Sequence, residues 1–334
     1  MHNVVQMSPS SIFVFLRLYY MKRLLILFLL TFIALPSLDA QRYRDPRTYY
    51  REFQSQNRRL NIKNMRYLEA VAQGLDERRV AKFREMVLDQ LKETKRDLER
   101  VGPYKEDDIL WKEYMTALDM YIEAYSKDFG KAQELSKEKY SSYENLQAYY
   151  DAASVAEIKL LDANYKIEKA EDFFGKTYKV DLRRDTAAMG KALRLDDVTV
   201  YTRDLALIFY RVDAHLLAIF KAVEENKTDT LSIIITDLRK DIRVAQAEIE
   251  DMGDYKGDDG LKEYVLGFIE DIDASIDEDL RPAAEILEAR YQDQESLADA
   301  KEQMEDYRLW HDDKSLDFFE ERKELILDEI EQEY

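Results

Sequence analysis

Apolar residues recur along most of the chain at spacings of three, four and seven residues, the pattern of α-helices that bury one face. The clearest series runs from Leu205 to Val223, where Leu, Ile and Val return every three or four positions. Glu, Lys, Asp, Arg and Gln fill the other faces, as in the solvated helices of a bundle. The pattern predicts helices over residues 43–73, 76–100, 106–137, 142–175, 199–225, 228–251, 259–290 and 294–333.

Two stretches of the sequence carry the same residues in the same order. Residues 101–114 read VGPYKEDDILWKEY, and residues 252–264 read MGDYKGDDGLKEY after one deletion. Further matches continue collinearly downstream and end with Asp-Phe-Phe at 172–174 and 317–319. Self-similarity of this kind is typical of a repeated structural unit. We therefore predict an all-α fold of two tandem, elongated four-helix bundles related by internal duplication.

The domain boundaries follow from this repeat. The first bundle is predicted over residues 41–175 and the second over residues 199–334. Residues 176–198 have a weaker apolar period and include a glycine, so we interpret them as a linker. Gly130 and Pro282 occupy similar places in the third helix of each unit, and proline removes a helical hydrogen bond. Both residues predict that this helix bends there.

The N-terminus has the layout of a secretory signal peptide. After Met21, two basic residues come before a 12-residue apolar stretch at 24–35, and a short polar end follows. A membrane anchor is the alternative, but a spanning helix needs about 20 apolar residues. Here Pro36 and Asp39 interrupt the run. We therefore expect residues 1–40 to be an N-terminal extension and a cleaved signal peptide. The protein is then exported to the periplasm or cell surface, with no transmembrane segment after cleavage.

The composition excludes several classes of function. The chain has no cysteine, so disulfides, thiolate nucleophiles and cysteine-ligated zinc are all excluded. Its 69 acidic residues outnumber 50 lysines and arginines, which gives a formal charge of −19. Removing residues 1–40 takes away three basic residues and one acidic residue, so the charge becomes −21. Such a charge repels nucleic acid, and we expect no nucleic-acid partner.

The repeated acidic turn is the most evident candidate for a metal site. It contains four weak candidate calcium ligands: Asp107, Asp108, Asp258 and Asp259. Neither copy has the alternating oxygens, central glycine and distal glutamate of an EF-hand loop. The alternative is a purely structural turn, in which Gly102 and Gly253 end one helix and the aspartates cap the next. We favour the structural interpretation.

Two histidines follow the signal peptide. His215 lies beside Leu216 on an apolar stripe, which favours a hydrogen-bonded core residue over a ligand or a base. His311 is expected to be exposed at a helix break. Neither belongs to the Glu-x-x-His pairs of di-iron bundles, and no HExxH, GxSxG, GxxxxGK or GxGxxG motif occurs. We therefore predict no cofactor and no catalytic activity.

Several of these segments carry a resemblance to a known family. Residues 255–264 and 316–319 resemble a family of uncharacterised bacterial helical surface proteins named after a leptospiral member. Residues 104–114 and 171–174 are similar to it in the same way. The resemblance implies an exported four-helix unit and no particular activity, because the family has no established active-site residues. Family members generally look like single units, so the tandem arrangement is a departure.

The end of the signal peptide, Asp-Ala-Gln, also looks like those of Bacteroidetes. In that group, Asp-Thr followed by a small or apolar residue can accept O-glycans. The tripeptides Asp-Thr-Ala and Asp-Thr-Leu fit this rule and make Thr186 and Thr230 candidate glycosylation sites.

Taken together, these features predict an exported, non-catalytic structural or interaction protein of the bacterial envelope. Two similar units would offer two similar faces, which suits bivalent binding to an envelope or surface protein. The alternative is a helical bundle that binds a small ligand or a metal between its helices, near His215 or the acidic turn.

Overall fold

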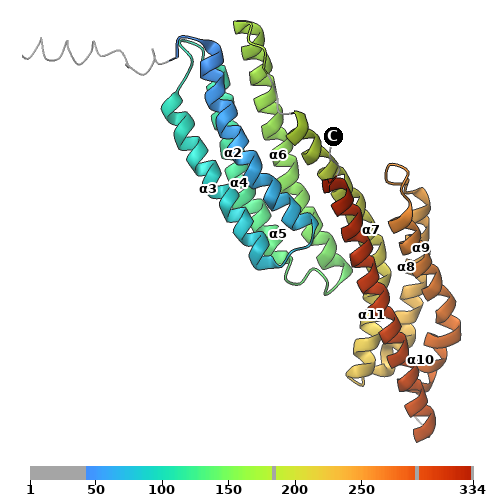
Figure 1. Ribbon diagram of the computed structural model, residues 1–334. Coiled ribbons are helices and arrows are strands. Elements are labelled where there is room, and N and C mark those ends of the chain that lie inside the picture. The colour runs from blue at the N-terminus through green and yellow to red at the C-terminus, as the bar shows by residue number, and fades with distance from the viewer. Residues whose placement is uncertain (1–42, 183–185, 290–292, 332–334) are drawn as a thin grey trace, which may run out of the picture.

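The chain is all-α. The computed structural model describes residues 43–182, 186–289 and 293–331, and its helices form two elongated bundles placed one beyond the other (Figure 1). In those ranges the only β-pairing consists of two isolated bridges, Tyr104 with Asp107 and Tyr255 with Asp258. The predicted signal peptide lies outside the described residues. No helix in the described ranges combines the length and the apolar character that crossing a bilayer requires.

The N-terminal bundle is built from helices whose bounds lie close to the predicted ones. These are α2 (Pro46–Ala72), α3 (Glu77–Val101), α4 (Ile109–Glu123), the π-helical turn η2 (Ala124–Asp128), α5 (Phe129–Leu135) and α6 (Tyr143–Tyr178). Its core is rich in aromatic rings at the end where α3 turns into α4. There Tyr49, Phe53 and Phe174 are almost completely buried, with ring centroids of Tyr49 and Phe53 5.1 Å apart.

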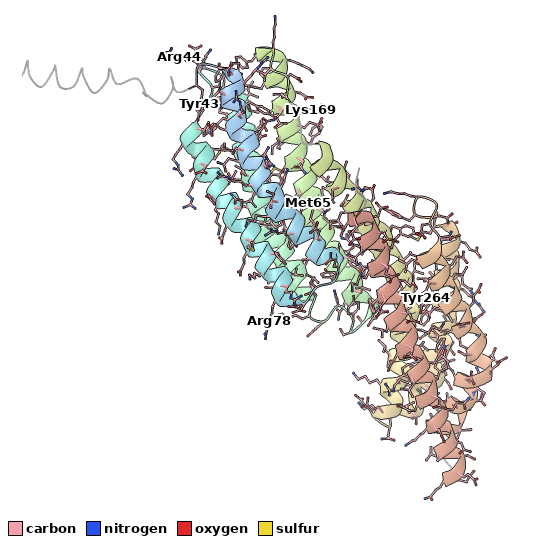
Figure 2. All side chains as sticks on the ribbon, in the orientation of Figure 1. Tyr43, Arg44, Met65, Arg78, Lys169 and Tyr264 are labelled. Atoms are coloured by element: carbon pink, nitrogen blue, oxygen red, sulfur yellow. The ribbon has the colours of Figure 1, made fainter. Side chains whose placement is uncertain are left out.

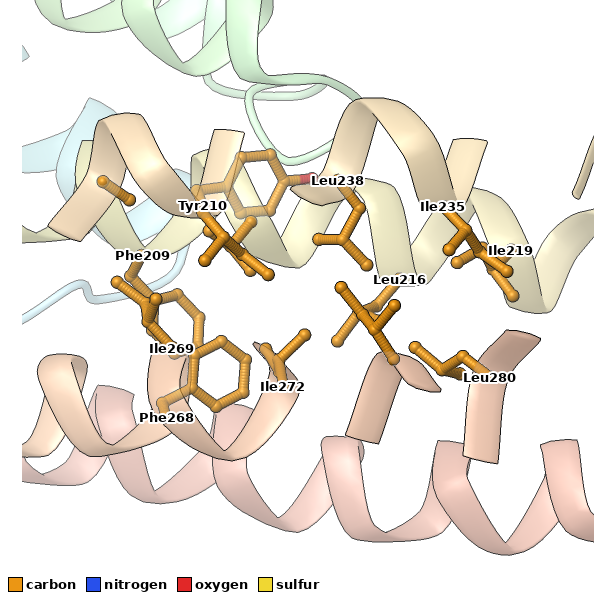
Figure 3. Close-up of a cluster of buried hydrophobic side chains, with 14 of the residues drawn as sticks. Phe209, Tyr210, Leu216, Ile219, Ile235, Leu238, Phe268, Ile269, Ile272 and Leu280 are labelled. Carbon is orange, nitrogen blue, oxygen red and sulfur yellow. The ribbon is translucent and has the colours of Figure 1, made fainter. Parts of the chain in front are cut away.

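The C-terminal bundle repeats this order of elements. It contains α7 (Thr186–Glu224), the short η3 (Thr228–Thr230), α8 (Leu231–Asp251), α9 (Gly260–Ser275), the π-helical turn η4 (Ile276–Leu280), α10 (Arg281–Glu288) and α11 (Gln294–Glu331). Its core is mainly aliphatic, and Figure 3 shows Leu216, Leu238 and Ile272 pointing toward one another. The ring of Phe209 stacks on that of Phe268, with centroids 4.4 Å apart.

The third helix of each bundle is deformed near the predicted place. In both, a five-residue π-helical turn interrupts the α-helix, directly before the turn that contains Gly130 or Pro282. Pro282 then lies in the first turn of α10, where its missing N–H costs least. The predicted bend thus takes the form of a π-helical turn.

The interpretation of residues 176–198 as a linker is wrong for most of its length. Helix α6 extends to Tyr178 and α7 begins at Thr186. The weak apolar period of this segment suggested a linker, but the segment is helical because of a contact between the bundles. Leu195 and Val198 are buried there together with Ala72 of α2. Tertiary packing of this kind stabilises a helix whose own amphipathic pattern is poor.

The two bundles therefore share an interface instead of being joined by a free segment. Met65 of α2, labelled in Figure 2, packs against the buried residues there. Lys191 of α7 pairs with Glu69 of α2 at 2.8 Å. At the other side of the interface, Leu146 and Tyr150 of α6 belong to the core of the C-terminal bundle.

Candidate functional site

The two acidic turns have the same backbone geometry. In the first, Tyr104 and Asp107 exchange two backbone hydrogen bonds of 3.0 Å, and Tyr255 and Asp258 exchange bonds of 2.9 and 2.8 Å in the second. The lysine that follows each tyrosine has a positive φ, 58° at Lys105 and 54° at Lys256. Each turn is therefore closed by its own main chain.

The first aspartate of each pair caps the helix that follows, while Asp108 and Asp259, at the N-cap position itself, make no capping bond with their side chains. The Oδ1 atom of Asp107 accepts the backbone N–H of Ile109 at 3.0 Å, and that of Asp258 accepts the N–H of Gly260 at 2.9 Å. Asp108 instead pairs with Lys112 at 2.6 Å. These bonds satisfy free N–H groups and place negative charge at a helix N-terminus.

The glycines behave differently in the two turns. Gly102 has φ 68° and ψ −174°, a conformation that favours glycine, and it follows the end of α3. Gly253 was expected to end its helix in the left-handed conformation that glycine favours, but it has no positive φ, so this expectation is wrong; Gly257 has φ 90° instead. In the second copy, α8 ends in extended backbone at Met252, so no left-handed residue is needed there.

The four candidate aspartates are not brought together. The first turn packs at the outer end of the N-terminal bundle, where Tyr104 contacts Phe174. The second lies at the contact between the bundles, where Tyr255 is buried and Lys256 pairs with Glu329 at 2.9 Å. Among the residues that the structure describes, no group of three or more His, Asp or Glu is arranged to hold a metal ion.

His311 is buried, and the prediction of an exposed histidine is wrong. It lies inside α11, which is continuous there, and only 2% of the residue is exposed. Its Nε2 atom is 2.6 Å from Oδ1 of Asp213 on α7. Burial by itself lowers the pKa of His311, but the hydrogen bond and charge of Asp213 outweigh burial, so the pKa is raised. The helix continues because its acidic flank at 312–313 faces solvent while His311 faces the core.

The surroundings of His311 do not form a catalytic triad. Ser315 donates to the same Oδ1 atom of Asp213 at 2.9 Å, and its Oγ is 3.3 Å from Nε2 of His311. The carboxylate therefore occupies the position at Nε2 that a nucleophilic serine needs. The arrangement is a buried ion pair with a supporting hydroxyl, and its chemistry is structural.

His215 lies at the edge of the C-terminal core. Its Nε2 atom is 2.7 Å from Oδ2 of Asp241 on α8, and 22% of its side chain is exposed. The predicted hydrogen bond is present, while the predicted core position is only partial. His215 lines neither of the two shallow depressions found between α11 and its neighbours.

Three carboxylates that the sequence pattern did not single out are buried: Glu171, Asp213 and Glu329. Glu171 of α6 accepts hydrogen bonds from the hydroxyls of Tyr50, at 3.0 Å, and Tyr114. Asn57 in turn donates to the Tyr114 hydroxyl at 2.7 Å. The burial of Glu171 could have been inferred from the sequence, because it lies on the apolar stripe of α6, beside Ala170 and three residues before Phe174. The network is enclosed in the core and links α2, α4 and α6.

The most unusual surface of the described residues is on α6. The buried face of this helix carries mostly small residues: Ala152, Ala153, Ala156, Ala163 and Ala170. Leu146, Tyr150 and Phe174 are also buried, but four other large apolar residues of α6 are exposed. Val155, Ile158, Leu161 and Tyr165 are each between 54% and 59% exposed. The alanines allow α4 to pack closely against α6.

Helix α7 adds to the same surface. Arg203 of α7 pairs with Glu157 of α6 at 2.8 Å, next to Val155 and Ile158 in sequence. On α7, Val200 and Leu193 are exposed, three and ten residues before Arg203. We call the six exposed residues the α6–α7 face: Val155, Ile158, Leu161, Tyr165, Leu193 and Val200.

Both helices also carry exposed carboxylates beside the residues of the α6–α7 face. Exposed acidic residues are interspersed with its apolar positions: Asp151, Asp162, Asp196, Asp197 and Asp204. Burial raises the pKa of Asp196, and the neighbouring Glu157 adds to this effect. One cation beside the face is Lys169, labelled in Figure 2, whose Nζ lies 5.0 Å from the Tyr165 ring centroid. An apolar face with an acidic rim suits a basic partner.

The two candidate glycosylation sites are in different settings. Thr230 is exposed and ends η3, directly before the buried Leu231. Thr186 is the first residue of α7. Glycosylation of both stays a prediction.

Comparison of the chain with models of known protein families, with curated proteins and with solved structures found no match.

Proposed function

We propose that this protein is an exported, non-catalytic interaction module of the bacterial envelope, which binds a basic amphipathic helix of a partner protein on the α6–α7 face. The observation that carries the proposal is that α6 has five alanines on its buried face and exposes four large apolar side chains. Single exposed apolar residues are normal on a protein surface, but a contiguous group points to a binding surface.

The rim of the face selects the partner's charge. The exposed aspartates repel a second copy of this acidic chain, whose formal charge is −19. A helix with Leu or Ile on one side and Lys or Arg at its edges satisfies both the apolar positions and the carboxylates. This is the helix-in-groove mode of recognition, in which apolar anchors recur every three or four residues.

The proposal gives one binding face instead of two. Helix α11 takes the place of α6 in the C-terminal bundle, and its buried face carries large residues such as Met304, Phe318 and Ile326. Phe319, at its surface, contacts Tyr140 of the N-terminal bundle, with ring centroids 5.6 Å apart. The contact between the bundles therefore already uses part of α11.

A peptide-binding experiment tests this function. The probe is a fluorescent Leu/Lys helix with an amphipathic period, compared with a scrambled peptide of equal charge. We expect the amphipathic peptide to bind at least tenfold more tightly and the double variant I158D/L161D to lose this preference. Because Ile158 and Leu161 are more than half exposed, the variant should keep its stability within about 0.5 kcal/mol.

A matched control separates the face from a general effect of charge. Ile233 on α8 is 63% exposed and lies outside the face, so I233D should bind as the wild type does. Equal binding of the two peptides, or an equal loss in I233D, would contradict the proposal.

Export and duplication are also part of this proposal. The signal-like residues 1–40 support export, and N-terminal sequencing of protein purified from its native host should give a start at Gln41. The recurrence of the acidic turn and of the π-helical turn at similar places in both bundles supports an internal duplication.

A further inference from the structure

The charge of the chain is divided unevenly along its length. Residues 199–334 contain 38 Asp and Glu against 16 Lys and Arg, which gives a net charge of −22. Residues 41–198 contain 30 Asp and Glu against 31 Lys and Arg, which gives a net charge of +1. The acidity of the protein therefore belongs to the C-terminal bundle, and the N-terminal bundle is close to neutral.

Helix α2 carries basic residues along its outer side. Its buried residues, among them Tyr49, Phe53 and Leu60, face the core of the bundle. On the opposite side, exposed residues recur at helical spacing and are mostly arginines. We call this set the α2 stripe: Arg47, Arg51, Arg58, Arg59 and Arg66, with the exposed Ile62 among them. Within the described ranges, no carboxylate lies at ion-pair distance from any of the five arginines.

Helix α11 carries acidic residues along its outer side. Exposed carboxylates recur there at spacings of three, four or seven residues, which places them on one side of the helix. Leu309 and Leu316 fall on the same side and are 52% and 58% exposed. We call this set the α11 stripe: Asp299, Glu302, Asp306, Asp313, Asp317 and Glu320, with the two leucines. No lysine or arginine of the described residues is at ion-pair distance from these six carboxylates.

The two stripes match in length as well as in charge. At about 1.5 Å per residue, α2 rises about 29 Å from Arg47 to Arg66, and α11 rises about 32 Å from Asp299 to Glu320. Each stripe also contains apolar side chains, Ile62 on α2 and the two leucines on α11. Two such helices can pack along their length, with opposite charges facing each other.

The α11 stripe also contains a hollow that suits an arginine side chain. A depression of about 460 Å³ is lined by Asp299, Glu302 and Asp306 of the stripe, and by the rings of Tyr307 and Trp310. A guanidinium group in this depression meets carboxylates, which pair with it, and aromatic faces, which attract it.

We propose that this protein forms a twofold dimer, in which the α2 stripe of each copy packs against the α11 stripe of the other. Figure 1 shows α2 and α11 on the side of the molecule that faces the viewer, one in each bundle. Two copies that face each other through this side and point in opposite directions form both contacts at once. Such a self-complementary arrangement is closed. It uses other residues than the α6–α7 face, so it does not rest on the proposed function.

A second copy fits the α2 stripe better than an anionic membrane does. A lipid surface would pair with the arginines, but it would repel the C-terminal bundle and leave Leu309 and Leu316 exposed. Two copies also carry like net charge, but at physiological ionic strength charges interact over only about 8 Å. The residues that face each other directly therefore decide the contact. The aspartates of the α6–α7 face keep a second copy away from that face, whereas the α2 stripe attracts it.

Sedimentation velocity of the chain purified from its native host tests the dimer. At an ionic strength of about 0.15 M we expect the mass of two chains. At about 1 M the screening length falls to about 3 Å, so the dissociation constant should rise at least tenfold. A wild type that stays monomeric at the lower ionic strength would overturn the proposal.

A charge swap identifies the surfaces that meet. R51E/R58E makes the α2 stripe acidic, and D306R/D313R makes part of the α11 stripe basic. Each variant alone should be monomeric, because like charges face each other in both contacts. An equimolar mixture should form a heterodimer, because both contacts regain opposite charges. Unfolding of a variant would not produce this recovery, and a mixture that stays monomeric would refute the pairing.

A matched control and a lipid assay complete the test. K240E/R243E changes the charge as R51E/R58E does, at exposed positions of α8 outside both stripes, and it should dimerise as the wild type does. An equal loss of dimer in this control would contradict the proposal. Flotation with vesicles of equal parts phosphatidylcholine and phosphatidylglycerol should recover no wild-type protein. Vesicle binding by a monomeric wild type that R51E/R58E abolishes would assign the α2 stripe to lipid instead.

Discussion

The buried pair of Asp213 and His311 gives a prediction whose size follows from the structure. Asp213 accepts from Nε2 of His311 at 2.6 Å and from Oγ of Ser315 at 2.9 Å. The substitution D213N keeps the shape and one oxygen acceptor but removes the charge. Both residues of the pair are nearly inaccessible to water, so solvent cannot replace the lost interaction.

The expected cost is about 2–3 kcal/mol at pH 6. Removing one partner of a buried ion pair typically costs about 3–5 kcal/mol, because the other charge is left unpaired. Here His311 can release its proton, and Asn still accepts from Ser315, so we place the value below that range. The partly exposed pair of His215 and Asp241, at a similar distance of 2.7 Å, is the control. D241N should cost less than about 1 kcal/mol.

The effect should depend on pH with a definite sign. The pKa of His311 is raised above its ordinary value of 6.5 in the folded protein. The stabilisation by the ion pair is therefore complete below about pH 6.5 and is lost as the pH rises through the raised, folded-state pKa. In D213N the main cause of the raised pKa of His311 is removed. The gap in unfolding free energy between wild type and D213N should narrow from pH 6 to pH 9.

Urea unfolding followed by tryptophan fluorescence measures this gap. Trp310 is next to His311 and lies over Tyr307, with ring centroids 5.0 Å apart, so it reports on the C-terminal bundle. Trp111 lies in the N-terminal bundle, and W111F makes Trp310 the only reporter. A gap below about 1 kcal/mol at pH 6, or a gap that does not change with pH, would refute the reasoning.

The acidic turns give two further predictions. G102A should cost about 1–3 kcal/mol, because φ 68° with ψ −174° is a glycine conformation. G253A, at the matching place without a positive φ, should cost less than half as much, and equal costs in urea unfolding would contradict this account. D107A and D258A should each lose about 1 kcal/mol through the missing cap. Calcium and chelator should leave the unfolding temperature of the wild type unchanged, and a rise of several degrees with calcium would show that capping is not the whole role of these residues.

The sequence by itself determined the helices and their local ends. The bounds of α2, α3 and α8 lie within a few residues of the predicted ranges, because apolar period and capping are properties of neighbouring residues. The deformation near Pro282 and the capping by Asp107 were predictable for the same reason. The burial of Glu171 could have been predicted from its position on the apolar stripe of α6, although a charged residue is not normally counted among the core residues.

Only the tertiary structure decided which faces meet. His311 and Asp213 are 98 residues apart, and nothing local shows that a histidine followed by two aspartates turns inward. The α6–α7 face arises because alanines, not the larger residues, fit against α4, which depends on how closely two helices approach. Leu195 and Val198 are helical because another bundle covers them. Packing and long-range electrostatics act through distances in space, which the spacing of residues along the chain does not encode.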